Sequence, residues 1–365
     1  MGLFSELFGN VLNVTWQQAL MIAIGALLIY LAIKKNMEPA LLLPMGFGAI
    51  LVNLPGIHTA AIETLFQAGI ANELFPLLLF IGIGAMIDFG PLLSTPKMML
   101  FGAAAQFGIF ITLLLSRLIG FSLFDAASIS IIGAADGPTA IYVANVLKSD
   151  YQGPIMVAAY SYMALVPIIQ PPVIRMVTTK KERLIRMAYQ PRSVTTATRI
   201  LFPIFVTMVA GAIAPASAEL VGFLMFGNLI RECGVLNSLS ETAQRELANL
   251  VTLLLGLSVA FKMQAELFVT FETIAIIALG LFAFVFDTVG GVLFAKLMTL
   301  FSKQKINPMI GAAGISAVPM SSRVVHKMGR AEDPDNFLLM YAAGANVSGQ
   351  IASVIAGGLI LSLIH

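Results

Sequence analysis

The sequence predicts an all-α protein that crosses a membrane many times, and three observations lead to this fold class. Of the 365 residues, 58% are hydrophobic and only 11% are charged, whereas about 25% of the residues in a soluble domain are charged. Apolar runs long enough to span a bilayer as helices recur along the chain. The charged residues gather in short segments between these runs.

The apolar runs predict roughly 10 to 11 membrane helices, taking about 17–25 residues for one span. The first half of the chain contains predicted spans at 17–33, 39–54, 74–93, 98–120, 124–147 and 153–177. The second half contains predicted spans at 200–215, 218–232, 245–262 and 272–301, a broken stretch at 306–325, and a last span at 337–364.

A basic polar segment at 178–198 joins the two halves. It carries Lys180, Lys181, Arg183, Arg186 and Arg192 against a single acid, Glu182. Membrane proteins keep loops with an excess of Lys and Arg in the cytoplasm. We therefore expect a cytoplasmic linker at 178–198 between a first membrane repeat, 12–177, and a second one, 199–365.

Short motifs recur between the halves and indicate an internal repeat. Ile132-Gly133-Ala134-Ala135 returns as Ile310-Gly311-Ala312-Ala313, and MGFG at 45–48 returns as LMFG at 224–227. Paired, interrupted hydrophobic segments in two halves are typical of transporters, where they mark a binding site near the middle of the membrane. We expect two inverted repeats whose broken, re-entrant-like elements meet there.

Both broken elements combine helix-breaking residues with polar ones. In the first, Gly137-Pro138 follows Asp136; in the second, Asn307-Pro308 precedes Gly311 and Ser316. Non-helical backbone at membrane depth is tolerated only where protein buries it or it lines a polar cavity. Carboxylate, amide, hydroxyl and freed carbonyl oxygens are hard donors, which suit an alkali cation or a proton and not a soft transition metal.

Asp136 is the main candidate for an ion-coupling group. An ionisable residue within a span costs about 2.5–3.5 kcal/mol on insertion scales and is by default a functional candidate. One carboxylate is able to hold a proton and a sodium ion in turn. The alternative is a structural role, as a helix cap or as the partner of an arginine.

Other polar residues in the spans have competing interpretations. Asp287 is a second acid within a predicted span, which we interpret as structural or secondary. Tyr162 belongs either to an interfacial belt or to the wall of a cavity, and Asn346 lies among small residues that are typical of tight helix packing. Arg323 is either an anchor at a helix end or a contact for an anion.

Several classes of function are excluded or not indicated. One cysteine, Cys233, rules out an intramolecular disulfide or a cysteine-based metal site. A net charge of +2 implies no nucleic-acid partner.

Four longer motifs resemble a known family. GAADGPTAIYVANVL, YSYMALVPIIQPPVIR, NPMIGAAGISAVPMSSRVV and YAAGANVSGQIASVIAGG look like the membrane β subunit of biotin-dependent, sodium-pumping decarboxylases that act on oxaloacetate, methylmalonyl-CoA or glutaconyl-CoA. The resemblance covers essentially the whole chain and implies a multi-pass protein of a bacterial or archaeal cytoplasmic membrane. Its implied activity is decarboxylation of carboxybiotin coupled to export of Na+, with a proton taken from the outer side and consumed.

The resemblance also assigns site residues and partners. It implies catalytic roles for Asp136 and Arg323, and Na+ binding by Asp136, Tyr162, Asn307, Gly311, Ser316 and Asn346. The implied cofactors are Na+ and a biotin carried on a partner subunit. The implied partners are that biotin carrier subunit, a carboxyltransferase α subunit that selects the acyl substrate, a small single-span membrane subunit and further copies of this chain.

Two other functions remain open from the sequence alone. One is a sodium-coupled secondary transporter of a carboxylate that performs no decarboxylation. The other is a structural membrane anchor for a peripheral enzyme, which predicts tolerance of substitutions at Asp136 and Asn307.

Overall fold

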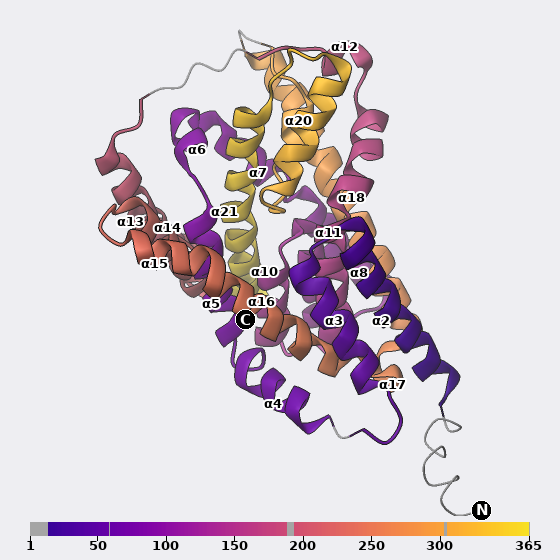
Figure 1. The fold of residues 1–365 in the computed structure, drawn as a ribbon. Coiled ribbons are helices and arrows are strands. Elements are labelled where there is room, and N and C mark those ends of the chain that lie inside the picture. The colour runs from indigo at the N-terminus through magenta and orange to yellow at the C-terminus, as the bar shows by residue number, and fades with distance from the viewer. Residues whose placement is uncertain (1–13, 58, 188–192, 303–304, 365) are drawn as a thin grey trace, which may run out of the picture.

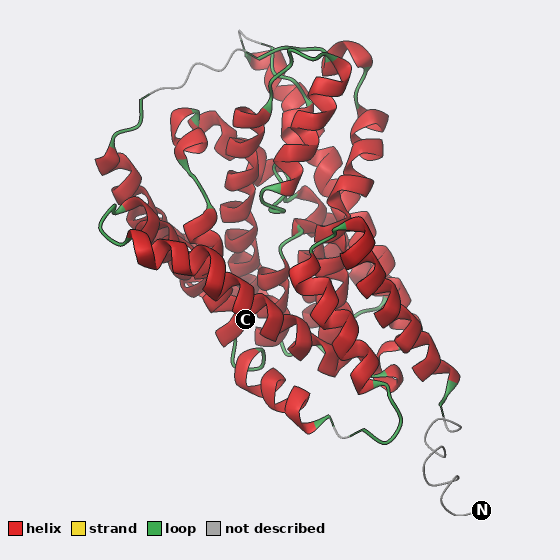
Figure 2. Cartoon of the chain, viewed as in Figure 1, coloured by secondary structure: helices red, strands yellow, loops and turns green. Residues whose placement is uncertain are grey.

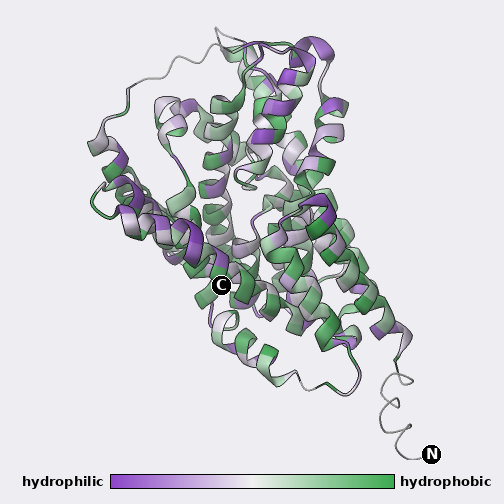
Figure 3. Ribbon diagram, viewed as in Figure 1, coloured by the Kyte–Doolittle hydropathy of each residue, from purple (hydrophilic) through white to green (hydrophobic). Residues whose placement is uncertain are grey.

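The computed structural model describes residues 14–57, 59–187, 193–302 and 305–364, and in those ranges it contains only helices, turns and loops (Figure 2). The predicted all-α fold is therefore confirmed. Hydrophobic residues cover most helices, and hydrophilic ones gather at the end of the bundle that carries α12 (Lys180–Arg183) and α20 (Met320–Glu332) (Figure 3). We call this end the basic end and the opposite one the far end.

Seven helical stretches in the described ranges are long and apolar enough to cross a membrane. A bent pair, α4 (Ala60–Gly69) with α5 (Leu74–Met86), makes an eighth if it counts as one span. The seven are Trp16–Lys35 (α2), Pro96–Ile119 (η1, α7 Met99–Ala104 and α8 Phe107–Ile119), Gln152–Val177 (α11), Thr196–Ile213 (α13), Asn237–Met263 (α15, η4, α16 Ala248–Val259 and η5), Phe271–Phe301 (α18) and Leu339–Ile364 (α21).

Seven or eight is fewer than the roughly 10 to 11 spans expected from the apolar runs. Two predicted spans are the short helices α3 (Pro39–Val52) and α14 (Ala218–Glu232), of 14 and 15 residues. At 1.5 Å per residue these helices reach about 21–22 Å, less than the hydrocarbon core of about 30 Å. The predicted span at 124–147 and the broken stretch at 306–325 are helical hairpins.

The first hairpin consists of α9 (Leu123–Ser130), η2 (Ile131–Ala134) and α10 (Gly137–Val146). Its two ends lie together, because the Asp125 carboxylate accepts a hydrogen bond from the Ser149 hydroxyl at 2.7 Å. Ala135 turns the chain in a left-handed conformation with φ of 53°. The hairpin therefore returns to the end of the bundle from which it enters.

The second hairpin consists of α19 (Met309–Ala312), the loop 313–319 and α20. Its two ends also lie together, since the side-chain amides of Asn307 and Asn336 both donate to the Arg183 carbonyl, at 2.9 and 3.0 Å. The tips of the two hairpins meet inside the bundle: the backbone N–H and the hydroxyl of Ser316 both donate to the Ala134 carbonyl, at 3.1 and 2.6 Å.

Long helices surround the two hairpins (Figure 1). α18 packs against α11, α8, α19 and η2, and α21 packs against α7, α10 and α20. Most buried hydrophobic residues of these elements belong to one cluster, while part of α11 joins a second cluster with α2, α3 and α16. The meeting of the broken elements agrees with the sequence; the inverted relation of two repeats, 12–177 and 199–365, stays a prediction.

The predicted linker lies at the basic end. Arg183 contacts Glu332 at 2.6 Å, and Arg186 contacts Asp333 at 2.5 Å. The Arg186 guanidinium holds the pKa of the Asp333 carboxyl below its ordinary value. These ion pairs tie the chain after α11 to the end of the second hairpin. Residues 188–192, which include the predicted linker residue Arg192, lie outside the described ranges.

Candidate functional site

Asp136 lies at the tip of the first hairpin, where it caps α10. It is 3% exposed, and its carboxylate accepts hydrogen bonds from the Thr139 hydroxyl at 2.7 Å and the Thr139 backbone N–H at 3.4 Å. A β/extended backbone at Asp136 and a proline in the first turn start the helix there. The capping role considered from the sequence is therefore present.

Capping is only part of what surrounds Asp136. The Gln350 amide and the Ser353 hydroxyl, both from α21, donate to the same carboxylate oxygen, Oδ2, at 2.8 and 2.7 Å. Among the described residues Asp136 has no ion-pair partner. The negative charge is thus held by dipoles alone, which excludes the structural arginine partner within those residues.

Asn346 lies on the same face of α21, because positions 346, 350 and 353 follow the i, i+4, i+7 spacing of one helical face. Its amide nitrogen donates to the Ile315 carbonyl in the second hairpin at 2.6 Å. Its amide oxygen is buried without a hydrogen-bond partner among the described residues. An open amide oxygen therefore lies beside the hairpin tips.

Ser316 brings the tip of the second hairpin to the same place through its two bonds to Ala134. The structure thus brings together Asp136, Ser316 and Asn346, three of the predicted site residues. It adds Thr139, Gln350 and Ser353, which sequence reasoning missed. The spacing of 346, 350 and 353 was the available signal, but small polar residues in membrane helices are also common in helix packing.

Two predicted ligands lie beside the tips without contacting Asp136. The Tyr162 hydroxyl donates to the Ile277 carbonyl of α18. Gly311 packs against Gly291, also of α18, so closely that a Cβ on either glycine would collide with the other's carbonyl oxygen. Both residues hold α18 against a neighbouring element.

The last two predicted residues occupy other parts of the second hairpin. Asn307 lies at its base, where its amide donates to the carbonyls of Arg183 and Ile185 at 2.9 and 2.8 Å. Arg323 lies in the first turn of α20, near the tip, with an exposed side chain. The assignment of Asn307, Gly311 and Tyr162 as Na+ ligands and of Arg323 as a catalytic group stays a prediction.

Asp287, the second acid, is fully buried beside the first hairpin's tip. One carboxylate oxygen accepts a hydrogen bond from the Gly108 backbone N–H in the first turn of α8. The other has no partner among the described residues, and a Cβ on Gly133 would lie 2.7 Å from it. Asp287 therefore faces η2, whose last residue, Ala134, lies two positions before Asp136.

The tips thus gather one carboxylate, an open amide oxygen, hydroxyls and backbone carbonyls in a buried place. All of these are hard oxygen donors that suit Na+. The three His, Cys, Asp or Glu groups that a transition-metal cluster needs do not occur together anywhere in the described ranges.

A family model and the similar proteins of known name all point to decarboxylase β subunits. Residues 17–364 match the family described as the Na+-transporting oxaloacetate decarboxylase beta subunit. The chain is similar to the glutaconyl-CoA decarboxylase subunit beta of Acidaminococcus fermentans, with 50% identity over 96% of this chain and 94% of the relative. It is similar to the methylmalonyl-CoA decarboxylase subunit beta of Veillonella parvula, with 50% identity over the same shares. It is also similar to the oxaloacetate decarboxylase beta chain of Klebsiella pneumoniae, with 44% identity over 95% of each chain.

Proposed function

The chain belongs to the family of β subunits of Na+-transporting decarboxylases, and on this premise we propose that Asp136 is the residue at which decarboxylation of carboxybiotin drives export of Na+. The observation that carries the proposal is a buried carboxylate at the contact of two hairpin tips, which has hydrogen-bond donors around it and no ion-pair partner among the described residues. A sodium-coupled symporter without decarboxylation is not favoured, because the relatives are decarboxylase β subunits.

The proposed Na+ site uses the oxygens that the tips bring together. Asp136 supplies the charge, Asn346 its open amide oxygen, and Ser316 a hydroxyl. Backbone carbonyls of the two tips complete the set, since the breaks at Ala135 and in the loop 313–319 leave their carbonyls outside regular helix. Gln350 and Ser353 hold the carboxylate in place.

The other predicted residues act on this site through the backbone. Asn307 fixes the base of the second hairpin, Gly311 allows its α19 to lie against α18, and Tyr162 holds α18 to α11. Asn307 and Gly311 thus set the position of the second hairpin, whose tip carries Ser316, and Tyr162 sets the position of α18, against which η2 and α19 pack. They are positioning residues in this proposal.

The chemistry requires a group whose charge changes when a proton replaces Na+. In the reaction the N–CO2 bond of carboxybiotin breaks, CO2 leaves, and the ring nitrogen takes up one proton. Arg323, exposed near the tip, attracts the anionic carboxybiotin. Protonation of Asp136 removes the charge that holds Na+ and so releases the ion. The same proton then passes to the ring nitrogen of biotin, which restores the Asp136 carboxylate.

The partners follow from the same family. We expect a carboxyltransferase α subunit that selects the acyl substrate, a biotin carrier subunit that brings carboxybiotin to Arg323, a small single-span membrane subunit, and an assembly with several copies of this chain. The relatives' different substrates, with β subunits that are 44–50% identical to this chain, support selection outside it.

The test is Asp136→Asn in the intact complex. The amide keeps the shape and removes the charge, so Na+-dependent decarboxylation and ²²Na+ transport should fall by about a hundredfold or more. Carboxyl transfer to biotin, which the α subunit performs, should stay at the wild-type rate. Asp88→Asn, at a half-exposed acid that pairs with Arg199, is the matched control and should keep full activity. Full Na+-dependent turnover in Asp136→Asn would show that the assignment is wrong.

A further inference from the structure

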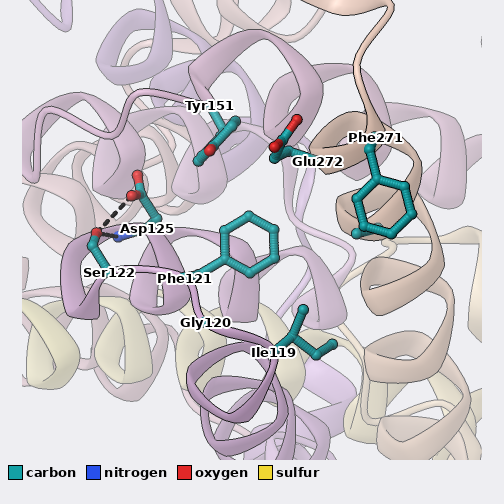
Figure 4. Close-up of a pocket in the computed structure, with 9 residues that line it drawn as sticks. Ile119, Gly120, Phe121, Ser122, Asp125, Tyr151, Phe271 and Glu272 are labelled. Carbon is teal, nitrogen blue, oxygen red and sulfur yellow. Dashed lines mark hydrogen bonds between the residues drawn. The ribbon is translucent and has the colours of Figure 1, made fainter.

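A pocket lined by both apolar and polar residues opens at the far end of the bundle. It has a volume of about 250 Å³ and lies between the α8–α9 turn and the first turns of α11 and α18. Figure 4 shows Asp125 and Ser122 on one side of it and Tyr151 and Glu272 on another. α18 begins in this pocket and ends at the basic end, where Lys296 pairs with Glu182 at 3.0 Å. By the positive-inside rule the pocket faces away from the cytoplasm.

A row of buried polar groups leads from the pocket into the bundle along α8. Gly120, which follows α8, lines the pocket. Ser116 and Thr112 come next at intervals of four residues and therefore share one helical face with Gly108. The hydroxyls of Thr112 and Ser116 are fully buried and have no hydrogen-bond partner among the described residues. We call these two residues the hydroxyl row.

Asp287 lies at the inner end of this row. Its carboxylate accepts a hydrogen bond from the Gly108 backbone, at the head of the same face of α8. Its open oxygen faces Gly133 in η2. Gly108 and Gly133 leave the space for the carboxylate, since a Cβ on either would lie 2.6 or 2.7 Å from one of its oxygens. The row therefore ends at the tip that carries Asp136, three residues beyond Gly133.

Unpartnered hydroxyls in this position need an explanation. A buried polar group without a hydrogen bond destabilises the folded protein, and an apolar side chain of the same shape would avoid that cost. A serine or threonine in a helix has its own i−4 carbonyl within reach, yet neither residue is bonded to one here. Both hydroxyls remain free to donate and accept in turn.

The family resemblance implies that the consumed proton comes from the outer side of the membrane, and we propose that the pocket, the hydroxyl row and Asp287 form its path from there to the hairpin tips. Each hydroxyl passes its hydrogen inward as it accepts one from the pocket side, and the open oxygen of Asp287 takes the proton. Four residues of helix rise about 6 Å, a step that one bridging water spans with two hydrogen bonds. An alkali cation would need several oxygens at each stop, whereas the row offers one hydroxyl per turn.

The surroundings of Asp287 favour a group that carries a proton over one that stays charged. Among the elements packed against this part of α18, α7, η2 and α19 contain no ionisable residue. The ionisable residues of the other packed elements are Arg117 of α8, which donates to the Phe121 carbonyl near the pocket, Asp125 of α9 in the pocket, and Tyr160, Tyr162 and Arg175 of α11. No cation among the described residues forms an ion pair with Asp287.

This path rests on the proposed function, because the proton it brings is the one that decarboxylation of carboxybiotin consumes. The two are separable by experiment. Asp136 is the Na+ group of the proposed function, and Asp287 and the hydroxyl row are not part of its Na+ site. Their loss should therefore leave Na+ binding intact.

The test uses the intact decarboxylase complex in liposomes, with substrate outside and the pocket facing the lumen. Turnover in the wild-type complex should make the lumen alkaline, which a trapped pH dye reports alongside ²²Na+ uptake. In Asp287→Asn, turnover and lumenal alkalinisation should both fall by about tenfold or more. Thr112→Val and Ser116→Ala should each lower them by about threefold and make turnover more sensitive to a rise in lumenal pH. Thr112→Ser, which keeps the hydroxyl, should restore wild-type behaviour.

Controls separate the path from a structural role. Thr207→Val removes a hydroxyl that is bonded to the Pro203 carbonyl of its own helix, away from the path, and should not change proton uptake. The thermal unfolding temperature of the Thr112→Val variant should be unchanged or higher, because the substitution removes a buried hydroxyl that has no hydrogen-bond partner among the described residues. Stabilisation of the complex by added NaCl should persist in Asp287→Asn and disappear in Asp136→Asn. If the Thr112→Val/Ser116→Ala double variant shows wild-type turnover and lumenal alkalinisation, the proposed path is wrong, whatever Asp287→Asn shows. That result would not contradict the proposed role of Asp136.

Discussion

The sequence alone identified Asp136 as a candidate site residue, but it did not identify the residues that form hydrogen bonds with it. A carboxylate between small residues in an apolar run is costly in lipid, so the sequence alone singles it out. Its partners Gln350 and Ser353 lie 214 and 217 positions away. Their role depends on which face of α21 meets the hairpin, and that depends on packing between distant segments. Asn346, on the same face, was predictable only through a family resemblance.

Gln350 offers a test of this local arrangement. In Gln350→Leu the Asp136 carboxylate loses one donor, and we expect the Na+ concentration for half-maximal decarboxylation to rise about tenfold. A hydrogen bond to a charged group contributes roughly 1.5–3 kcal/mol, and 1.4 kcal/mol is a factor of ten. The control is Gln244→Leu, which removes the hydrogen bond that the Gln244 side-chain amide donates to the Ser240 hydroxyl, elsewhere in the chain. An unchanged Na+ dependence in Gln350→Leu would mean that its amide does not support the site.

Glycine and proline predicted that both elements are broken and re-entrant-like, but the end of the bundle to which each one returns was not predictable. The pairs at 137–138 and 307–308 mark both hairpins in the sequence. That each returns to its own end follows from contacts such as Asp125 with Ser149, 24 positions apart. A hydropathy pattern reports how apolar a segment is and carries no information about whether it turns back. The hairpin at 124–147 therefore resembles a full span in sequence.

The contact between Gly291 and Gly311 allows a test at the scale of elements. If Gly311 serves close packing of α19 on α18, then Gly311→Ala and Gly291→Ala should both lower the stability of the subunit, by about 1–3 kcal/mol as for other overpacked sites. Thermal unfolding of the purified complex measures this. The competing role as a Na+ ligand predicts a different pattern, in which Gly291→Ala is tolerated and only Gly311→Ala changes the Na+ dependence.

At the scale of the whole molecule, the basic end connects the two halves of the chain. Arg183 lies in the segment after α11, and its guanidinium bonds Glu332 at the end of the second hairpin and the Thr178 carbonyl. Its backbone carbonyl accepts from both Asn307 and Asn336. The sequence identified this segment only as a basic loop that sets orientation. The structure adds that it fixes the base of a hairpin.

Arg183→Ala should therefore destabilise the second hairpin from a distance. The side chains of Arg183 and Glu332 are 13% and 17% exposed, and loss of the arginine leaves a largely buried carboxylate without its partner. We expect a loss of about 1–3 kcal/mol in stability and faster proteolysis of the second hairpin in the assembled complex. Lys181→Ala changes an exposed neighbour with no such contact among the described residues, and it should leave the stability and the proteolysis rate unchanged. Equal proteolysis of the two variants would contradict the role of Arg183 in fixing the second hairpin.

The contact of the two hairpin tips also has an electrical consequence. Each hairpin is fixed at its own end of the bundle, and the tips are held together by the bonds of Ser316 to one carbonyl, that of Ala134. Where water follows each hairpin inward, the transmembrane voltage falls across this short contact. A charge that moves past Ala134 then does work against nearly the whole voltage, about 2.3 kcal/mol per elementary charge at 100 mV. A shift of the tips over a small distance would thus be enough to convert chemical energy into membrane potential.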